Sequence, residues 1–261
     1  MIITIAVLVA LTIAVAAFVL APRLTEERIV YDVTPDRPAS FGCSMSWLAI
    51  RTTDQTRVCD VLGLTPLERA NWSNGIGTAY DDQLGGSRLY LTPPVDGWTF
   101  VVGLTLPQPL GPAFIDKCTP VLLDLAAAFP EAQYYLTFPM LDFYAWARVI
   151  DGKLVRAYAI GDEGLIWNKG RPTNDEREFG ITLSQIKGVR KRKGDTALSM
   201  LIYPTETHVV HLAGRWSIDP TMLSKHAPWT SEPPGQSGNV ALGLICHPPA
   251  RWLPERMRRT G

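Results

Sequence analysis

The sequence lacks net charge and has few of the residues that most often do chemistry. Its 261 residues include 25 Lys or Arg, 25 Asp or Glu and only 4 His. Because a neutral chain has no bulk attraction for phosphates, the composition disfavours nucleic-acid binding. A hydrophobic fraction of 46% still provides enough apolar surface for a packed core, so we expect a folded protein.

Motifs of catalysis and cofactor binding are also missing. The four cysteines, Cys43, Cys59, Cys118 and Cys246, form no CxxC pair, which disfavours zinc and redox sites. No serine lies in a G-x-S-x-G motif, and no glycine-rich loop has the context of a phosphate site. We therefore predict no catalytic residue, no metal and no cofactor. The cysteines are either free or, in an oxidising compartment, joined in two disulfides.

The N-terminus is a long stretch without charge. Residues 2–21 read IITIAVLVALTIAVAAFVLA. At about 1.5 Å per residue, such a helix matches a hydrocarbon core of roughly 30 Å. A cleaved signal peptide is the alternative, but no Lys or Arg precedes the stretch and Pro22 follows the only suitable cleavage site. We predict a single-pass inner-membrane anchor, with the lipid bilayer as the partner of residues 2–21.

Basic residues beside the anchor predict its orientation. Arg23 and Arg28 lie downstream, whereas only the terminal amine lies upstream. Positive residues favour the cytoplasmic side, so we expect the globular part in the cytoplasm. Glu26 and Glu27 weaken this bias and keep a periplasmic domain as the alternative.

We divide the chain into an anchor over residues 1–21, a tether over 22–40 and a single domain over 41–261. Strands and helices without regular βαβ alternation predict an α+β fold, with an antiparallel sheet of hairpins and a meander packed against several helices. Asp96-Gly97 and Asp151-Gly152 are typical hairpin turns. The expected strands are residues 43–52, 88–92, 98–103, 133–138, 142–150, 153–160 and 165–170.

Helix boundaries are read from capping residues. Thr65-Pro66-Leu67-Glu68 combines a capping hydroxyl, a proline suited to the first helical position and a glutamate that completes a capping box. This motif predicts a helix over residues 65–80. We expect the chain from Pro228 onward to be irregular. The other expected helices are residues 54–62, 113–129, 173–180 and 205–214.

Some side chains allow an enzyme as an alternative. His208 and His211 share one face of an expected helix, but a metal site needs a third ligand. Asp162 and Glu163 can act as paired carboxylates, although adjacent acids are common in turns. A metal-assisted hydrolase would have to assemble its site from such scattered residues.

A basic cluster, KGVRKRK, occupies residues 187–193. In a membrane-anchored protein we expect Arg190, Lys191, Arg192 and Lys193 to lie against anionic lipid. A solvated loop is the alternative. The chain also has eight tryptophans, most of which we expect to anchor the core.

Two segments resemble a family of uncharacterised bacterial proteins. They are residues 144–180, YAWARVIDGKLVRAYAIGDEGLIWNKGRPTNDEREFG, and residues 208–223, HVVHLAGRWSIDPTML. Their order is a Trp-Arg strand, a Gly turn, a Gly-Glu turn and a late Trp-Ser-x-Asp-Pro-Thr element. FGCSMSWLAIRT and LTPPVDGWTFVVG are similar in kind. The family has no established activity, so the resemblance implies an accessory protein, loosely associated with toxin immunity, and no catalytic residue. The added anchor departs from its soluble pattern.

These features predict a membrane-anchored, non-catalytic protein-binding module. An immunity protein that neutralises a bacterial toxin is the favoured form, and a structural module of an envelope complex is a further alternative. Tryptophan and arginine are frequent energetic centres of interfaces. The expected binding residues are Trp146, Arg148, Asp162, Glu163, Trp167, Arg215 and Trp216.

Overall fold

A computed structural model describes residues 29–109, 116–162, 164–180, 204–226 and 242–252, together with Leu11, Thr12 and Val15. The chain divides into two compact units, Met1–Tyr31 and Asp32–Gly261. Leu11, Thr12 and Val15 are helical, and the rest of the expected anchor lies outside the described residues. Within the described residues, no helix has the length and apolar character needed to cross a membrane.

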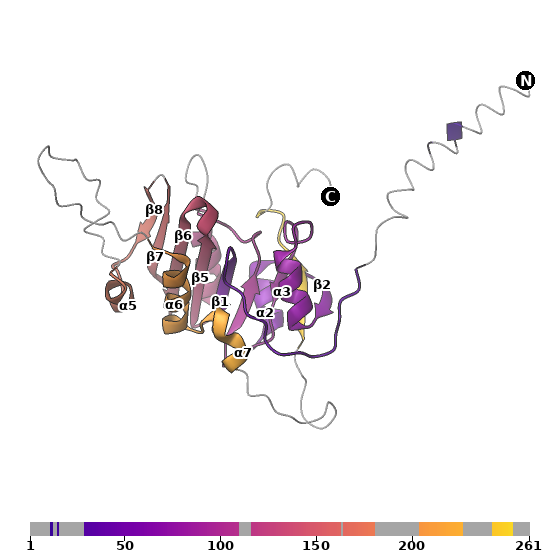
Figure 1. The fold of residues 1–261 in the computed structure, drawn as a ribbon, viewed down its shortest axis with the longest axis horizontal. Helices are drawn as coiled ribbons and strands as arrows, with labels where there is room; N and C mark the ends of the chain where they lie inside the picture. Colours follow the sequence, from indigo (N-terminus) through magenta and orange to yellow (C-terminus); the bar gives the residue numbers. More distant parts are fainter. Residues whose placement is uncertain are drawn as a thin grey trace, which may run out of the picture. The chain divides into compact units, whose positions relative to one another are not determined.

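One antiparallel sheet of nine strands organises the second unit. The strand order is β2-β9-β3-β4-β1-β5-β6-β7-β8, with β8 and β2 at the two edges (Figure 1). This sheet and its helices confirm the α+β class. The strands are β1 (Ser46–Ile50), β2 (Thr65–Ala70), β3 (Leu89–Leu91), β4 (Thr99–Val102), β5 (Glu131–Phe138), β6 (Phe143–Ile150), β7 (Lys153–Gly161), β8 (Gly164–Lys169) and β9 (Gly243–His247).

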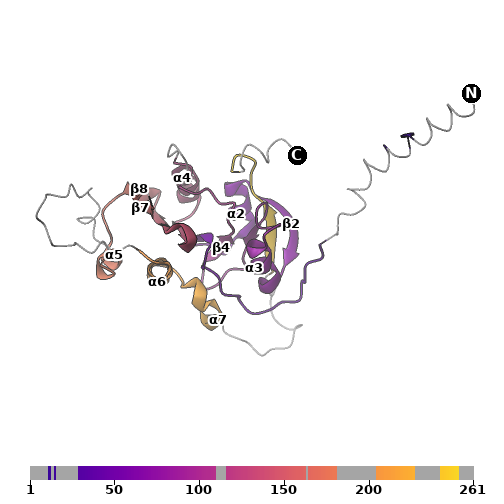
Figure 2. The same cartoon turned by 45° about the horizontal axis from the view of Figure 1, so that its top comes forward.

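Helices cover both faces of the sheet. Helices α2 (Gln55–Leu62) and α4 (Cys118–Ala128) lie on one side, where α4 contacts β5, β6 and β7. On the other side, α6 (Glu206–Trp216) contacts β5 and β6, and α3 (Trp72–Tyr80) contacts β3 and β9 (Figure 2). The short elements are α5 (Asn174–Glu178), α7 (Leu223–His226) and the 3-10 turns η1 (Pro139–Leu141) and η3 (Pro220–Met222).

Both expected hairpin turns are present. Asp96 and Gly97 have φ of 47° and 80°, and Asp151 and Gly152 have φ of 46° and 77°. Two successive residues in the left-handed region give the turn whose twist suits a two-residue hairpin. These turns join β3 to β4 and β6 to β7, and the meander from β5 to β8 is also confirmed.

The helix expected over residues 65–80 is wrong in its first half. Residues 65–70 form β2, which pairs with β9 at the sheet edge, where the missing N–H of Pro66 is tolerated. Helix α3 begins at Trp72, and the Asn71 side chain caps it by accepting the backbone N–H of Asn74 at 3.0 Å. The capping residue is therefore Asn71 and not Thr65.

The expected irregular tail also needs correction. Residues 243–247 form β9, which fills the gap between β2 and β3. The short apolar run GLICH has its Ile245 and Cys246 side chains fully buried.

Helix α4 also starts later than the expected residue 113. It begins at Cys118, and Asp116 and Lys117 are not helical. Residues 113–115 lie outside the described residues.

Part of the expected tether packs on the domain. The carboxylate of Asp36 accepts the backbone N–H groups of Trp72 at 2.7 Å and Ser73 at 2.8 Å, at the start of α3. The Asn71 side-chain amide donates to the carbonyl of Thr34 at 2.9 Å. The chain is therefore fixed to the domain from about residue 32 onward, within the second unit.

Candidate functional site

An aromatic row crosses the face of the sheet covered by α6. Trp47, Tyr135, Trp146 and Tyr158 lie opposite one another on β1, β5, β6 and β7. The rings of Trp47 and Tyr135 stack with centroids 5.0 Å apart, and those of Trp146 and Tyr158 stack at 4.3 Å. All four side chains are buried, so the row is an internal platform.

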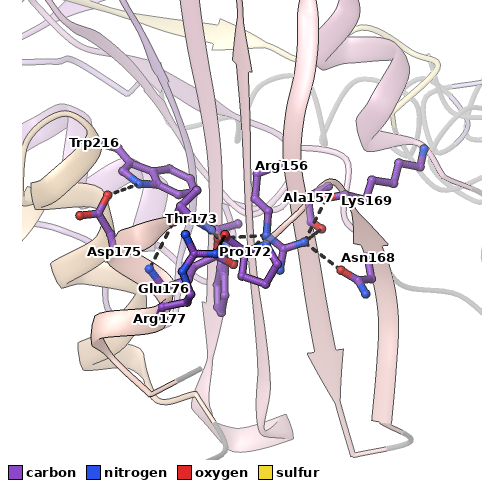
Figure 3. A network of polar contacts seen from close by, with 11 residues as sticks. Arg156, Ala157, Asn168, Lys169, Pro172, Thr173, Asp175, Glu176, Arg177 and Trp216 are labelled. Atoms are coloured by element: carbon purple, nitrogen blue, oxygen red, sulfur yellow. Dashed lines mark hydrogen bonds and ion pairs between the residues drawn. The ribbon is translucent and has the colours of Figure 1, made fainter. Parts of the chain in front are cut away.

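A buried ion pair lies beside this row. Arg156 on β7 and Glu176 on α5 have 1% and 0% of their side chains exposed. Arg156 Nε donates to both carboxylate oxygens of Glu176, at 2.8 and 3.0 Å (Figure 3). The Trp146 indole donates to Glu176 Oε1 at 2.9 Å, and Arg156 also donates to Asn168 Oδ1 at 2.8 Å. The buried charges are therefore paired and hydrogen-bonded, as such charges must be.

The local sequence explains how Glu176 reaches this position. Thr173 caps α5 and its hydroxyl accepts the backbone N–H of Glu176 at 3.2 Å. The Glu176 carboxylate returns to the backbone N–H of Thr173 at 2.7 Å, which completes a capping box. The cap expected at Thr173 is confirmed, and the helix expected over residues 173–180 is the shorter Asn174–Glu178. Sequence reasoning missed that the same glutamate is the counterion of Arg156, because no local pattern reports a partner 20 positions away.

A second polar group joins β5 and β6 to the end of α6. Glu131 accepts from Arg148 Nε at 2.7 Å and from the Gln133 side-chain amide at 2.8 Å. Gln133 also donates to the carbonyl of Trp216 at 3.0 Å and accepts the Tyr135 hydroxyl at 2.8 Å. Burial raises the pKa of Tyr135 well above its usual value, so the phenol stays protonated as the donor.

Three of the predicted binding residues meet in these contacts. Trp146 and Trp216 are buried, and the Arg148 guanidinium lies 5.3 Å from the centre of a Trp216 ring. The Trp216 indole donates to Asp175 Oδ2 at 3.0 Å, which links α6 to α5 (Figure 3). The structure therefore gathers Trp146, Arg148 and Trp216, but as contacts that hold α5 and α6 on the sheet.

The other predicted binding residues lie apart from this group. Trp167 on β8 is 1% exposed and packs in the core on the α4 side. Asp162 is exposed at the end of β7, and Arg215 is 57% exposed and pairs with Glu178 at 3.5 Å. Glu163 and the basic residues Arg190, Lys191, Arg192 and Lys193 lie outside the described residues.

The two histidines of α6 have a structural arrangement. His208 Nδ1 accepts the backbone N–H of Thr205 at 3.0 Å, at the start of the helix. Burial, and secondly the nearby His211, lower the pKa of His208. In the part of the chain that the structure describes, no three His, Cys, Asp or Glu side chains are grouped to hold a metal ion.

A shallow pocket lies where α6 meets η3. Its volume is about 170 Å³, below the roughly 300–1,000 Å³ of typical small-molecule sites. Its polar lining comes mainly from Glu206, His211 and Asp219. Nearby, the exposed Cys43 thiol forms a hydrogen bond with the Glu206 carboxylate. This hydrogen bond, together with partial burial, raises the pKa of Cys43 to about 11.

An exposed apolar tip stands between β5 and β6. In η1, Met140 is 89% exposed and Leu141 is 55% exposed. The tip is flanked by Phe138 and Phe143, which pair with each other on β5 and β6. Just before it, the Thr137 hydroxyl donates to the carbonyl of Gly42 at 2.6 Å. Sequence reasoning missed this feature, although an apolar Pro-Met-Leu between two strands was a signal for it.

Comparisons with protein families, curated proteins and solved structures found no match for this chain.

Proposed function

We propose that the chain is a membrane-anchored, non-catalytic protein-binding module of the toxin-immunity type. The observation that carries the proposal is the exposed tip formed by Met140 and Leu141. Large apolar side chains this exposed are unfavourable in water, and methionine adapts well to a partner surface. Both ends of the tip are fixed by the pairing of Phe138 with Phe143, which lowers the entropic cost of binding.

The buried polar groups support a structural role over a catalytic one. Both carboxylate oxygens of Glu176 accept hydrogen bonds from Arg156. The side chain of Gln133 likewise donates to Glu131 and to the carbonyl of Trp216 at the end of α6. A catalytic group needs access to a substrate, whereas the side chains of Arg156 and Glu176 are buried between α5 and the sheet, with 1% and 0% of their surface exposed. This arrangement supports binding through the surface of the domain.

The proposal is tested by photo-crosslinking in native membranes. A photoreactive amino acid replaces Met140 in the full-length protein, and the matched control replaces Lys153, which is exposed at the opposite end of β6 and β7. We expect a cross-linked protein with the probe at position 140 and none with the probe at 153. Equal cross-linking from both positions, or none at either, would count against the tip as the binding site.

The immunity role needs a separate assay. Co-expression of the captured partner should arrest growth, and the wild-type chain should restore it. Met140→Asp should lose most of this protection, because it places a charge at the apolar contact. A non-toxic envelope component as partner would favour the structural module instead, and substrate turnover by the purified protein would overturn the non-catalytic proposal.

A further inference from the structure

Helix α2 is tied at both of its ends to the chain around β9. At its start, the side-chain amide of Gln55 donates to the carbonyl of Leu242, just before β9, at 3.2 Å. At its end, the carbonyl of Leu62 accepts from the guanidinium of Arg251, beyond β9, at 3.4 Å. The helix and the strand therefore run side by side in the same direction, although they are far apart in the sequence.

Two cysteines meet between these anchor points. Cys59 on α2 is 4% exposed and Cys246 on β9 is 0% exposed, and both belong to the same apolar cluster. Both are free thiols, and they are hydrogen-bonded to each other. A disulfide needs two cysteines on backbones that approach closely and direct their side chains toward each other. The packing of α2 on β9 supplies this arrangement.

The other two cysteines have different surroundings. Cys43 is exposed, and its thiol is hydrogen-bonded to the Glu206 carboxylate. The thiol of Cys118 is buried and donates to the carbonyl of Pro107 at 3.1 Å. Sequence alone does not determine which cysteines pair. The fold does so for one pair, because it brings the thiols of α2 and β9 into contact.

We infer that Cys59 and Cys246 are a disulfide-forming pair, which in oxidising surroundings links α2 covalently to β9. The two thiols lose two protons and two electrons, and one S–S bond forms between their sulfurs. The oxidant is another disulfide, whose own S–S bond is reduced to two thiols by thiol–disulfide exchange. The new bond replaces the hydrogen bond between the thiols and a weak one from Cys246 to the carbonyl of Leu244 at 3.7 Å.

The position of β9 gives this bond a structural effect. Strand β9 lies between β2 and β3, so β2 is joined to the rest of the sheet through β9. A covalent link from β9 to α2 holds this end of the sheet together, and it closes a long loop, which restricts the unfolded chain strongly. The inference goes beyond the proposed function and does not depend on it, because the Met140 tip belongs to η1.

The test uses the full-length protein in a mild detergent, equilibrated with mixtures of reduced and oxidised glutathione. Urea below the unfolding transition lets the core open transiently, so that buried thiols can react. After alkylation of the remaining thiols, mass spectrometry of unreduced peptides should find one linked pair, containing Cys59 and Cys246 and lighter by two hydrogen atoms than the separate peptides. Cys59→Ala and Cys246→Ala should each abolish this product. The matched controls, Cys43→Ala and Cys118→Ala, should retain it, and circular dichroism verifies that each variant is folded.

Unfolding of the oxidised and reduced proteins provides a second measurement. The bond should lower the equilibrium constant of unfolding by about thirtyfold or more in the wild type and in Cys43→Ala, and oxidation should have no such effect in Cys59→Ala. Iodoacetamide labelling of the reduced protein in the same urea shows that both thiols can be reached. If they are labelled there but stay unlinked in oxidised glutathione, the inference is wrong. A link from either cysteine to Cys118, or a bond that forms without stabilising the protein, would also overturn it.

Discussion

Arg156 and Glu176 combine almost complete burial with opposite charge, and each depends on the other. Removing Glu176 leaves the guanidinium without its counterion and the Trp146 indole without its acceptor. Glu176→Ala should therefore lower the free energy of unfolding by about 3–5 kcal/mol. Thermal and urea unfolding of the full-length protein, followed by tryptophan fluorescence, measures this loss.

A double variant distinguishes the cost of one unpaired buried charge from the contribution of the whole ion pair. Because an apolar replacement of a buried ion pair is often tolerated, Arg156→Met combined with Glu176→Leu should recover the part of the stability that Glu176→Ala loses through the unpaired guanidinium. The part due to the lost acceptor of the Trp146 indole should remain lost. A single variant that unfolds like the wild type would contradict the role we assign to this pair.

Alanine substitutions at two glycines of α3 should change the free energy of unfolding in opposite directions. A Cβ at Gly75 would lie 2.1 Å from the Tyr90 ring, whereas a Cβ at Gly77 meets nothing within 4 Å. Gly75→Ala should cost about 1–3 kcal/mol or more through overpacking. Gly77→Ala should instead stabilise α3 by roughly 0.5–1 kcal/mol, because alanine loses less entropy in a helix. Unfolding midpoints of the two variants that shift in the same direction would contradict this account.

Cys43 is exposed but should react slowly. Only the thiolate is nucleophilic, and a pKa of about 11 leaves very little thiolate at pH 8. Glu206→Gln removes the carboxylate that raises this pKa, so iodoacetamide labelling of Cys43 at pH 8 should accelerate by about tenfold or more. Glu178→Gln, at another exposed acid, is the control and should leave the rate unchanged. Mass spectrometry of the labelled peptide follows the reaction with pH.

Single elements could be predicted where the signal is local. Asp54 and Thr173 cap α2 and α5 as their side chains suggest, and two Asp-Gly turns specify their hairpins. Residues 65–70 show the limit, because their capping pattern was overruled by pairing with β9, a partner about 180 positions away in the sequence. Non-local pairing also explains why β9 itself was missed.

The candidate site shows the same limit at the level of side chains. Trp146, Arg148 and Trp216 were predicted as binding residues, yet the burial of Trp146 and Trp216 could not be read from the sequence. Tryptophan and arginine suit an interface and a buried network equally well, and only the packing of α5 and α6 distinguishes the two. The Met140 tip was overlooked because loops are expected to be polar.

Residues 32–36, which precede the first strand, are packed on the domain through hydrogen bonds to the start of α3. Asp36 satisfies two backbone N–H groups at the start of α3, so Asp36→Ala should cost about 1 kcal/mol and release residues 32–36. Hydrogen exchange should then be faster in this segment and in the first turn of α3, and unchanged in β5 to β7. Asp96→Ala, in the β3–β4 turn, is a control that should leave the segment protected. Equal exchange in wild type and Asp36→Ala would show that other contacts hold the segment.

For the whole molecule, the remaining question is how residues 2–21 place the domain in the cell. Twenty residues without charge predict that the full-length protein stays in the membrane pellet after alkaline carbonate extraction. A chain that begins at residue 29 should move to the supernatant, because it lacks the apolar stretch. Arg23 and Arg28 predict a cytoplasmic domain, so protease added to intact spheroplasts should leave it uncut and should degrade it after lysis. Degradation in intact spheroplasts would instead place the domain in the periplasm, and release of the full-length protein by carbonate would contradict the anchor itself.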